Sequence, residues 1–250
     1  MNKDSLEALF DNEVPAIRVA NFCTPAEAER LVRVVKTKGF DFYEDVVPPI
    51  GRIGITQFEH SNKSKDEYLG MVERSSRSRD AIFQQAAFNP LLRVKRVLGQ
   101  TLNCPVGFAQ EPMHGEYFAG LIRQIDNSAK KHFDFAPYDA KGWAIEQVTK
   151  QVAWNIYLEM PDQGGETVVY NQPWLPDKFE RFLLEGHSGS YGFSDACVEG
   201  AQAIVIKPRV CDLWLFNTRN FHEVLGSSGP RITVSSFVGQ TAPREYVMWS

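Results

Sequence analysis

The feature that most constrains the fold is a succession of short apolar or alternating segments from Gly115 to the C-terminus. Turn residues separate these segments, as in 161–165 and 226–230. Segments of this length, bounded by Gly, Pro, Asp and Ser, are typical of β-strands rather than helices. We predict strands at Tyr117–Ile125, Gln151–Met160, Thr167–Tyr170, Ala201–Ile206, Asp212–Phe216, Arg231–Val238 and Glu245–Trp249.

The N-terminal third has a different pattern, with signals for helix ends. Thr24-Pro25-Ala26-Glu27 has the form of a capping box, with Pro at the first helical position and Gly39 as the stop. A second helical region is predicted from about Ser78 to Leu98, interrupted at Asn89-Pro90. Strand-like stretches at Ala16–Phe22 and Ile50–Phe58 flank the first helix.

Together these patterns predict a mainly β protein with N-terminal helices packed on a β-sandwich or jelly roll. No internal repeat or linker divides the chain, so we expect a single domain over 1–250. Within it, 1–114 is expected to be a helical support region and 115–250 the β core. One helical interruption of the β core is expected, near Pro176 to Leu184.

The composition excludes several classes of protein. Hydrophobic residues make up 43% and charged residues 23%, which is too apolar for a disordered chain. A net charge of −4 gives no electrostatic reason to expect a nucleic-acid or membrane partner. No apolar run is long enough to span a bilayer, the N-terminus lacks the pattern of a signal peptide, and the four cysteines show no paired spacing. We therefore expect a cytoplasmic protein with reduced thiols.

The segment with most chemical content is 131–137, which contains His132 and Asp134. On a strand, residues two apart lie on the same face, so the imidazole and the carboxylate would lie side by side. They offer two of the three ligands of a 2-His-1-carboxylate iron site. A His-x-Asp pair alone often arises by chance.

Three more residues, all in the C-terminal part of the chain, make the pattern more specific. His222 follows the predicted strand Asp212–Phe216, and Arg231 and Thr233 begin the next strand, which we take as the hairpin partner of the His222 strand. Arg231 presents a planar fork suited to a carboxylate. The alternative is a satisfied core histidine, a surface Asp and a solvated Arg.

With these residues in place, the chain resembles the iron(II)/2-oxoglutarate-dependent oxygenases. Further resemblance lies in Gly164–Thr167 and in Ala20–Phe22 before the capped helix. The stretch 161–174 and the C-terminal 246–250 are most similar to the branch of carrier-independent aliphatic halogenases of hapalindole-type alkaloid biosynthesis and hydroxylases of free small molecules, including N-substituted amino acids. The resemblance implies a double-stranded β-helix as the core.

The resemblance also implies a ligand set and cofactors. His132, Asp134 and His222 would bind iron(II), and Arg231, with Thr233 beside it, would bind the far carboxylate of 2-oxoglutarate. O2 is the third reactant, and ascorbate is expected to stimulate. The halogenases carry Gly where this chain has Asp134, so hydroxylation is favoured over halogenation. A second departure is 207–212, which lacks the Gly of a tight turn found in many members, without affecting the ligands.

Candidate pocket residues come from strand alternation and from the resembling branch. Arg123 precedes the metal pair on a predicted strand and would bind substrate or the near carboxylate of 2-oxoglutarate; the alternative is a solvated sheet face. The other candidates for the pocket wall are Ile53, Ile55, Gln57, Ala153 and Asn155. For the two isoleucines, the alternative is a place in the hydrophobic core.

Other motifs carry less weight. Gly186–Ser190 fails as a serine-hydrolase elbow because Ser190 stands where the motif needs Gly, so we interpret it as a loop. His60 and His114 have no ligand partners nearby in the sequence.

The expected function is hydroxylation of an aliphatic C–H bond in a free small molecule, either an amino-acid derivative or a natural-product intermediate, by a monomer or homodimer. Desaturation, cyclisation or epoxidation at the same site remains open. An alternative of a different class is a non-catalytic β-sandwich module that binds a small acid.

Overall fold

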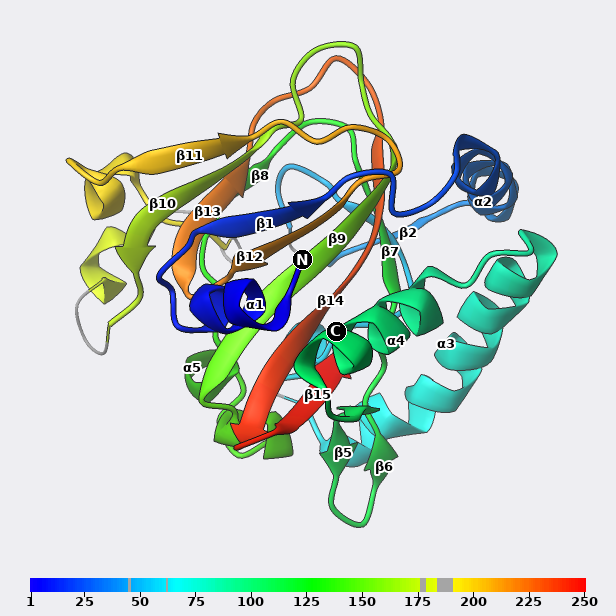
Figure 1. Ribbon diagram of the computed structural model, residues 1–250, viewed down its shortest axis with the longest axis horizontal. Helices are drawn as coiled ribbons and strands as arrows, with labels where there is room; N and C mark the ends of the chain where they lie inside the picture. Colours follow the sequence, from blue (N-terminus) through cyan, green and yellow to red (C-terminus); the bar gives the residue numbers. More distant parts are fainter. Residues whose placement is uncertain (45, 62, 176–178, 184–190) are drawn as a thin grey trace.

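Two β-sheets face each other in the computed structural model, which describes residues 1–44, 46–61, 63–175, 179–183 and 191–250 (Figure 1). The larger sheet has nine strands: β1 (Ala16–Val19), β2 (Asp41–Phe42), β3 (Gly51–Ile53), β4 (Val106–Phe108), β7 (Leu121–Ile125), β9 (Lys150–Glu159), β12 (Leu213–Asn217), β14 (Arg231–Ala242) and β15 (Glu245–Trp249). The smaller sheet contains β8 (Ala129–His132), β10 (Thr167–Pro173), β11 (Ala203–Ile206) and β13 (Asn220–Val224). A separate two-stranded ribbon joins β5 (Gln110–Glu111) to β6 (Gly115–Glu116).

The strand order is that of a jelly roll and confirms the predicted fold class. The large sheet runs β1-β12-β9-β14-β7-β3-β2, and the small sheet runs β11-β10-β13-β8. All pairs are antiparallel except β15 with β4. Consecutive strands β12 and β13 lie in different sheets, and so do β13 and β14. The chain therefore crosses repeatedly between the two layers and brings distant segments to the space between them.

Four long helices cover the outer face of the large sheet. They are α1 (Lys3–Phe10), α2 (Pro25–Lys38), α3 (Lys65–Gln85) and α4 (Pro90–Leu102). Their apolar residues form one core with the outward-facing side chains of the sheet, including Trp154, Leu215 and Val234. Because side chains alternate along a strand, the neighbouring Ala153 and Asn155 face the small sheet instead. The helices thus support the sheet from behind and leave its inner face for a site.

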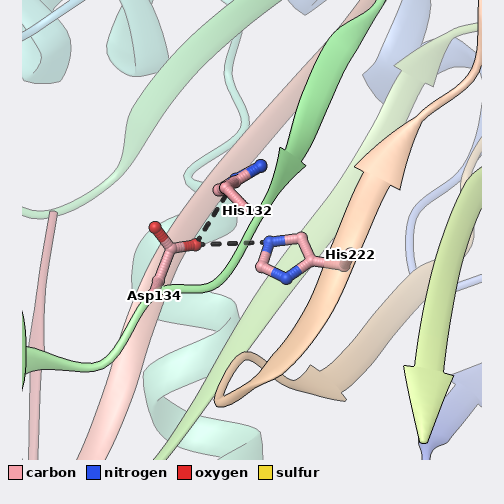
Figure 2. Close-up of side chains that lie close together, drawn as sticks. All are labelled: His132, Asp134 and His222. Carbon is pink, nitrogen blue, oxygen red and sulfur yellow. Dashed lines mark ion pairs between the residues drawn. The ribbon is translucent and has the colours of Figure 1, made fainter. Parts of the chain in front are cut away.

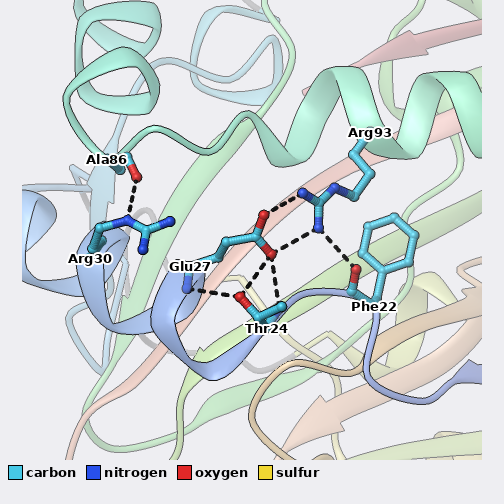
Figure 3. A network of polar contacts seen from close by, with 6 residues as sticks. All are labelled: Phe22, Thr24, Glu27, Arg30, Ala86 and Arg93. Carbon is cyan, nitrogen blue, oxygen red and sulfur yellow. Dashed lines mark hydrogen bonds and ion pairs between the residues drawn. The ribbon is translucent and has the colours of Figure 1, made fainter.

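A polar network fixes α2 against the other helices (Figure 3). The Thr24 side chain accepts from the Glu27 backbone N–H at 3.2 Å, and Glu27 accepts in return from the Thr24 N–H at 2.9 Å, as the capping box predicts. Arg93 of α4 donates to both Glu27 carboxylate oxygens and to the Phe22 carbonyl. The hydrogen bond from Arg93 is the main reason that the pKa of Glu27 is lowered to about 2.

Several elements differ from the prediction. Helix α3 begins at Lys65, well before Ser78, because Ser64 caps it and Tyr68 and Val72 are buried. The strand at Ile50–Phe58 is shorter than expected, and a 3₁₀ turn, Phe58–His60, follows it. The expected helix near Pro176 falls partly outside the described residues, and within them Glu180–Phe182 forms a 3₁₀ turn.

Helix α1 and the one-turn helix α5 (Ala136–Asp139) were not predicted. The first 114 residues contain the long helices, but they also contribute strands to the large sheet. The expected boundary at 114 therefore does not divide a helical region from the β-sheets. Short 3₁₀ turns lie at Ala144–Gln147 and Asp195–Val198. Among the described residues, no helix has the length and apolar character needed to cross a membrane.

Candidate functional site

A cavity of about 330 Å³ lies between the two sheets. Most of its lining is apolar, with a small number of charged and polar side chains, which is the usual character of a small-molecule site. It contains all three predicted metal ligands as well as Arg231 and Thr233. The sequence therefore identified the residues that the fold brings to one place.

The three candidate ligands come from two adjacent strands of the small sheet and the bend after one of them (Figure 2). His132 ends β8 and lies directly opposite His222 of β13 in the strand register. Asp134 lies just past the end of β8, where its N–H donates to the Thr218 carbonyl at 2.9 Å, so it is not on the strand as predicted. The side chain nevertheless turns toward the two imidazoles.

The ligand atoms converge closely enough to bind one ion. Asp134 Oδ2 is 3.3 Å from His222 Nε2 and 3.8 Å from His132 Nε2. One ligand atom from each residue lies within 4.8 Å of the other two. Two imidazoles and one carboxylate in this arrangement fit the facial triad of a non-haem iron(II) site.

Backbone contacts determine which nitrogen of each histidine faces the centre. His132 Nδ1 lies 2.6 Å from the Lys130 carbonyl oxygen, and His222 Nδ1 lies 3.0 Å from that of Asn220. A carbonyl only accepts, so each Nδ1 carries the proton and each Nε2 of a neutral ring has a free lone pair. Such contacts are the usual way in which metal-binding histidines are oriented.

The protonation states also suit metal binding. Burial, reinforced by the neighbouring His222, lowers the pKa of His132 to about 4, so its imidazole is neutral at physiological pH. Burial alone would raise the pKa of Asp134, but the two histidines beside it lower the value to about 2. A neutral imidazole and an ionised carboxylate are the forms that coordinate metal.

Arg231 is a buried cation without a carboxylate partner among the described residues. Arg231 begins β14 and faces His222 from the opposite sheet. The prediction that it lies on the hairpin partner of the His222 strand is therefore wrong. Its Nη2 donates to Tyr157 Oη at 3.3 Å and to Thr167 Oγ1 at 3.2 Å, and its Nε has no partner within the part of the chain that the structure describes. Thr233, on the same strand face, has a buried Oγ1 that makes no hydrogen bond to any described residue.

Arg123 faces the cavity from β7, in register with Thr233. Its guanidinium contacts the Tyr43 hydroxyl and lies close enough to Asp134 for their charges to affect each other's pKa. Its Nε has no hydrogen-bond partner in the described ranges. The interpretation of Arg123 as a solvated surface residue is therefore wrong.

The other pocket candidates divide between the cavity and the core. Gln57, Ala153 and Asn155 line the cavity. Ile53 packs in the core beneath the helices, and Ile55 packs in a second core around Tyr68 and Trp143. The prediction that these two isoleucines form a pocket wall is corrected, because Ile53 lies on the helix-facing side of β3 and the bend after β3 takes Ile55 into the second core.

Several cavity residues were missed by the sequence analysis. Ser235 is two residues beyond Thr233 on β14, and alternation would have identified it. Phe135, Tyr138 and Phe193 form an aromatic wall on the opposite side, and no local pattern predicts that Phe193 lies there. His60 is buried against Tyr68 and His114 lies near Asp66, both outside the cavity lining; Gly186–Ser190 lies outside the described residues.

With this geometry established, comparison with known proteins identifies the family. The model described as carrier-protein-independent halogenase WelO5 matches residues 1–250. The chain belongs to the WelO5 family. The predicted membership of the iron(II)/2-oxoglutarate oxygenases, close to the carrier-independent halogenases, is thereby confirmed.

Proteins similar to this chain include a biosynthesis cluster protein, a hydroxylase and a dioxygenase. Leucinostatins biosynthesis cluster protein S of Purpureocillium lilacinum is 40% identical over 222 residues, which cover 84% of this chain and 90% of that protein. L-gamma-glutamyl-L-propargylglycine hydroxylase of Streptantibioticus cattleyicolor is 32% identical over 136 residues, 53% of this chain and 48% of that protein. The crystal structure of an N-substituted L-amino acid dioxygenase from Burkholderia ambifaria AMMD superposes on this chain with a TM-score of 0.68 and 17% sequence identity. The match covers 99% of this chain and 91% of the dioxygenase chain, and it shows that the two share a fold.

Proposed function

We propose that this WelO5-family protein is an iron(II)- and 2-oxoglutarate-dependent dioxygenase that hydroxylates an aliphatic C–H bond of a free small molecule. The observation that carries the proposal is the convergence of three ligand atoms in one cavity with a buried Arg231 that has no carboxylate partner among the described residues. The substrate class that we propose is an amino-acid derivative or natural-product intermediate. Relatives named as amino-acid dioxygenases and hydroxylases support this class.

The residues present fit an iron(II) ion. His132 and His222 direct their Nε2 atoms, and Asp134 an ionised oxygen, toward one centre. When bound, iron(II) with 2-oxoglutarate and O2 supplies the oxidising power for the reaction. The three residues would hold the ion on one face only, which would leave positions for the cosubstrate and O2.

The residues also fit 2-oxoglutarate. Arg231 is 3% exposed and, among the residues that the structure describes, has only neutral hydrogen-bond partners, so a desolvated carboxylate would complete its environment. Thr233 adds an unpartnered hydroxyl on the same strand face. Arg123, one strand away, is proposed to contact the near carboxylate.

Asp134 decides between the two reactions that the family suggests. Its carboxylate would take a coordination position on the metal, in contrast to the Gly of the halogenases that the sequence resembles, and hydroxylation is therefore the proposed outcome. The apolar lining of the cavity excludes water and holds the substrate carbon near the metal site. We further propose that the protein acts without nucleic-acid or membrane partners, as a monomer or homodimer, and that ascorbate stimulates it.

The proposal is tested by turnover. The protein is incubated with iron(II), 2-oxoglutarate, ascorbate and O2, with and without a panel of aliphatic amino acids and their N-acyl forms. We expect succinate formation that requires iron and O2, with one panel member gaining one oxygen atom by mass spectrometry. A folded, iron-loaded protein that yields no succinate with or without any of these compounds would contradict the proposal.

A further inference from the structure

The carboxylate ligand Asp134 differs from the two histidine ligands in how the fold holds it. His132 and His222 lie opposite each other on paired strands. Asp134 lies in the short segment between the end of β8 and the start of α5 at Ala136. The ladder bonds of β8 and the helical bonds of α5 therefore do not fix its main chain, and other contacts must determine where its carboxylate points.

Gln151 provides such a contact from the opposite sheet. It is the second residue of β9, is 3% exposed and lines the cavity on the inner face of the large sheet. Its Nε2 donates to the Asp134 carbonyl oxygen at 3.1 Å, and its Oε1 accepts from the Ala136 N–H at 2.9 Å. The side chain thus reaches from the large sheet to the main chain of the metal-binding segment.

A carboxamide suits this position because it ends in one donor and one acceptor. The Asp134 carbonyl requires a donor and the Ala136 N–H requires an acceptor, so only one orientation of the Gln151 amide satisfies both. The contact with Ala136 is buried, where an unpaired backbone group is costly. The Gln151 amide therefore has one favoured orientation, which fixes the main chain of 134–136.

A second contact holds the other side of the Asp134 main chain. Its N–H donates to the carbonyl of Thr218, in the turn between β12 and β13, at 2.9 Å. The N–H and the C=O of one residue are thus bound to two separate parts of the fold. With both held, the Asp134 side chain turns toward the imidazoles, and its Oδ2 lies 3.3 Å from His222 Nε2. Without Gln151, the residue could turn about the Thr218 contact that remains.

We propose that Gln151 is a positioning residue, which holds the Asp134 carbonyl and so directs the Asp134 carboxylate toward the metal ion. Gln151 acts through the main chain of Asp134 and is not itself a ligand. Contacts of this kind, one step removed from the metal, orient the groups that coordinate it. The inference rests on the proposed function for the identity of the metal.

Metal binding tests this role. The anaerobic protein is titrated with iron(II) in the presence of saturating 2-oxoglutarate. Gln151→Ala removes both hydrogen bonds and leaves space for water from the cavity to pair with the two backbone groups, so the variant should remain folded. We expect its Kd for iron(II) to rise about 10- to 100-fold, the usual effect of losing a contact that orients a metal ligand. Gln151→Met, which keeps the bulk of the side chain and neither bond, should show the same rise.

Gln57→Ala is the matched control. Gln57 is 4% exposed and lines the same cavity, and its Nε2 has no partner among the described residues. The substitution removes the same atoms from a glutamine of similar burial that does not bind the segment 134–136. It should leave the Kd for iron(II) unchanged.

A double-mutant cycle separates positioning from a general loss of stability. In an Asp134→Ala background there is no carboxylate to direct, so adding Gln151→Ala should not weaken metal binding further. The cycle uses nickel(II), which nitrogen and oxygen ligands bind more tightly than iron(II), so that binding by the two remaining histidines can be measured. A merely structural role for Gln151 would give the same loss in both backgrounds.

A folded Gln151→Ala or Gln151→Met protein that binds iron(II) as tightly as wild type would overturn the inference. An equal loss in Gln57→Ala, or a loss that persists without the Asp134 carboxylate, would also overturn it. Failure of the proposed function has a different signature, because the wild-type protein would then form no succinate, whereas failure of the positioning role leaves wild-type turnover intact.

Discussion

Replacing Arg231 by Met separates a ligand-binding role from a structural one. The guanidinium is 3% exposed, and its partners are the neutral hydroxyls of Tyr157 and Thr167. The ring of Tyr157 also lies beneath it, 4.9 Å from the guanidinium carbon to the ring centre. The Tyr157 ring offsets part of the positive charge, but none of these contacts brings a negative charge, so a carboxylate of 2-oxoglutarate would be the main electrostatic partner of Arg231.

The size of the effect on affinity follows from this environment. Removing one partner of a desolvated, hydrogen-bonded charge pair costs about 2–5 kcal/mol. Because about 1.4 kcal/mol is a factor of ten, the Kd for 2-oxoglutarate in Arg231→Met should rise by at least about 30-fold. Titration of the anaerobic iron(II)-loaded protein with 2-oxoglutarate measures the change, and Arg231→Lys, which keeps the charge but loses the planar fork, should lie between.

The ligand-free variant should remain folded. Met removes a desolvated charge, which is favourable, and two hydrogen bonds worth about 1 kcal/mol each, so the free energy of unfolding should stay within about 2 kcal/mol of wild type. Saturating 2-oxoglutarate should raise the Tm of the iron-loaded wild type and not that of the variant. An unchanged affinity for 2-oxoglutarate in a folded Arg231→Met protein would refute this reasoning.

Three further predictions concern the metal site and the scaffold. Burial and His222 lower the pKa of His132 to about 4, so the iron(II) affinity of the protein should not fall through protonation of this residue until the pH approaches about 4. A His132-dependent loss of iron(II) affinity centred near the ordinary histidine pKa, about 6.5, would count against a buried neutral imidazole. Glu27→Gln should lower the free energy of unfolding at pH 7 by about 1–3 kcal/mol in urea melts. Because hydrogen bonding to Arg93 lowers the pKa of Glu27 from 4.5 to about 2, the extra stability of the wild type should shrink as the pH falls below 4.5 and be lost near 2. A stability difference that does not change with pH would contradict the pairing. Gly164→Ala places a Cβ 2.0 Å from the Gly226 carbonyl oxygen at a φ of +82°, so thermal melts should show a loss of about 3 kcal/mol or more, and a variant as stable as wild type would show that this turn can shift.

The sequence predicted those parts of the fold that depend on local signals. Thr24 and Glu27 form both bonds of the capping box, and Asn89 caps the helix that begins at Pro90. Strand β15 has the bounds that were predicted, and β9 differs by one residue at each end. The metal triad was found because two ligands lie close together in sequence and the family resemblance located His222.

Other features depend on tertiary contacts that a local pattern does not contain. The sequence of α3 before Ser78 is strongly polar, and its burial of Tyr68 comes from the packing of a distant core. Ile53 and Ile55 have the spacing of a pocket wall, yet Ile53 faces the helices from β3 and the bend after β3 takes Ile55 into a second core. Asp134 leaves the strand because its backbone bonds to the Thr218 carbonyl, a contact that only the folded chain creates.

The central claim is that His132, Asp134 and His222 hold an iron(II) ion to which 2-oxoglutarate binds. The most direct measurement is the visible absorption of the anaerobic protein after addition of iron(II) and then 2-oxoglutarate, with His132→Ala beside wild type. The account predicts one iron per chain and a weak charge-transfer band that appears with 2-oxoglutarate and is absent from the variant. A folded wild-type protein that shows no band, or a band that persists in His132→Ala, would contradict it.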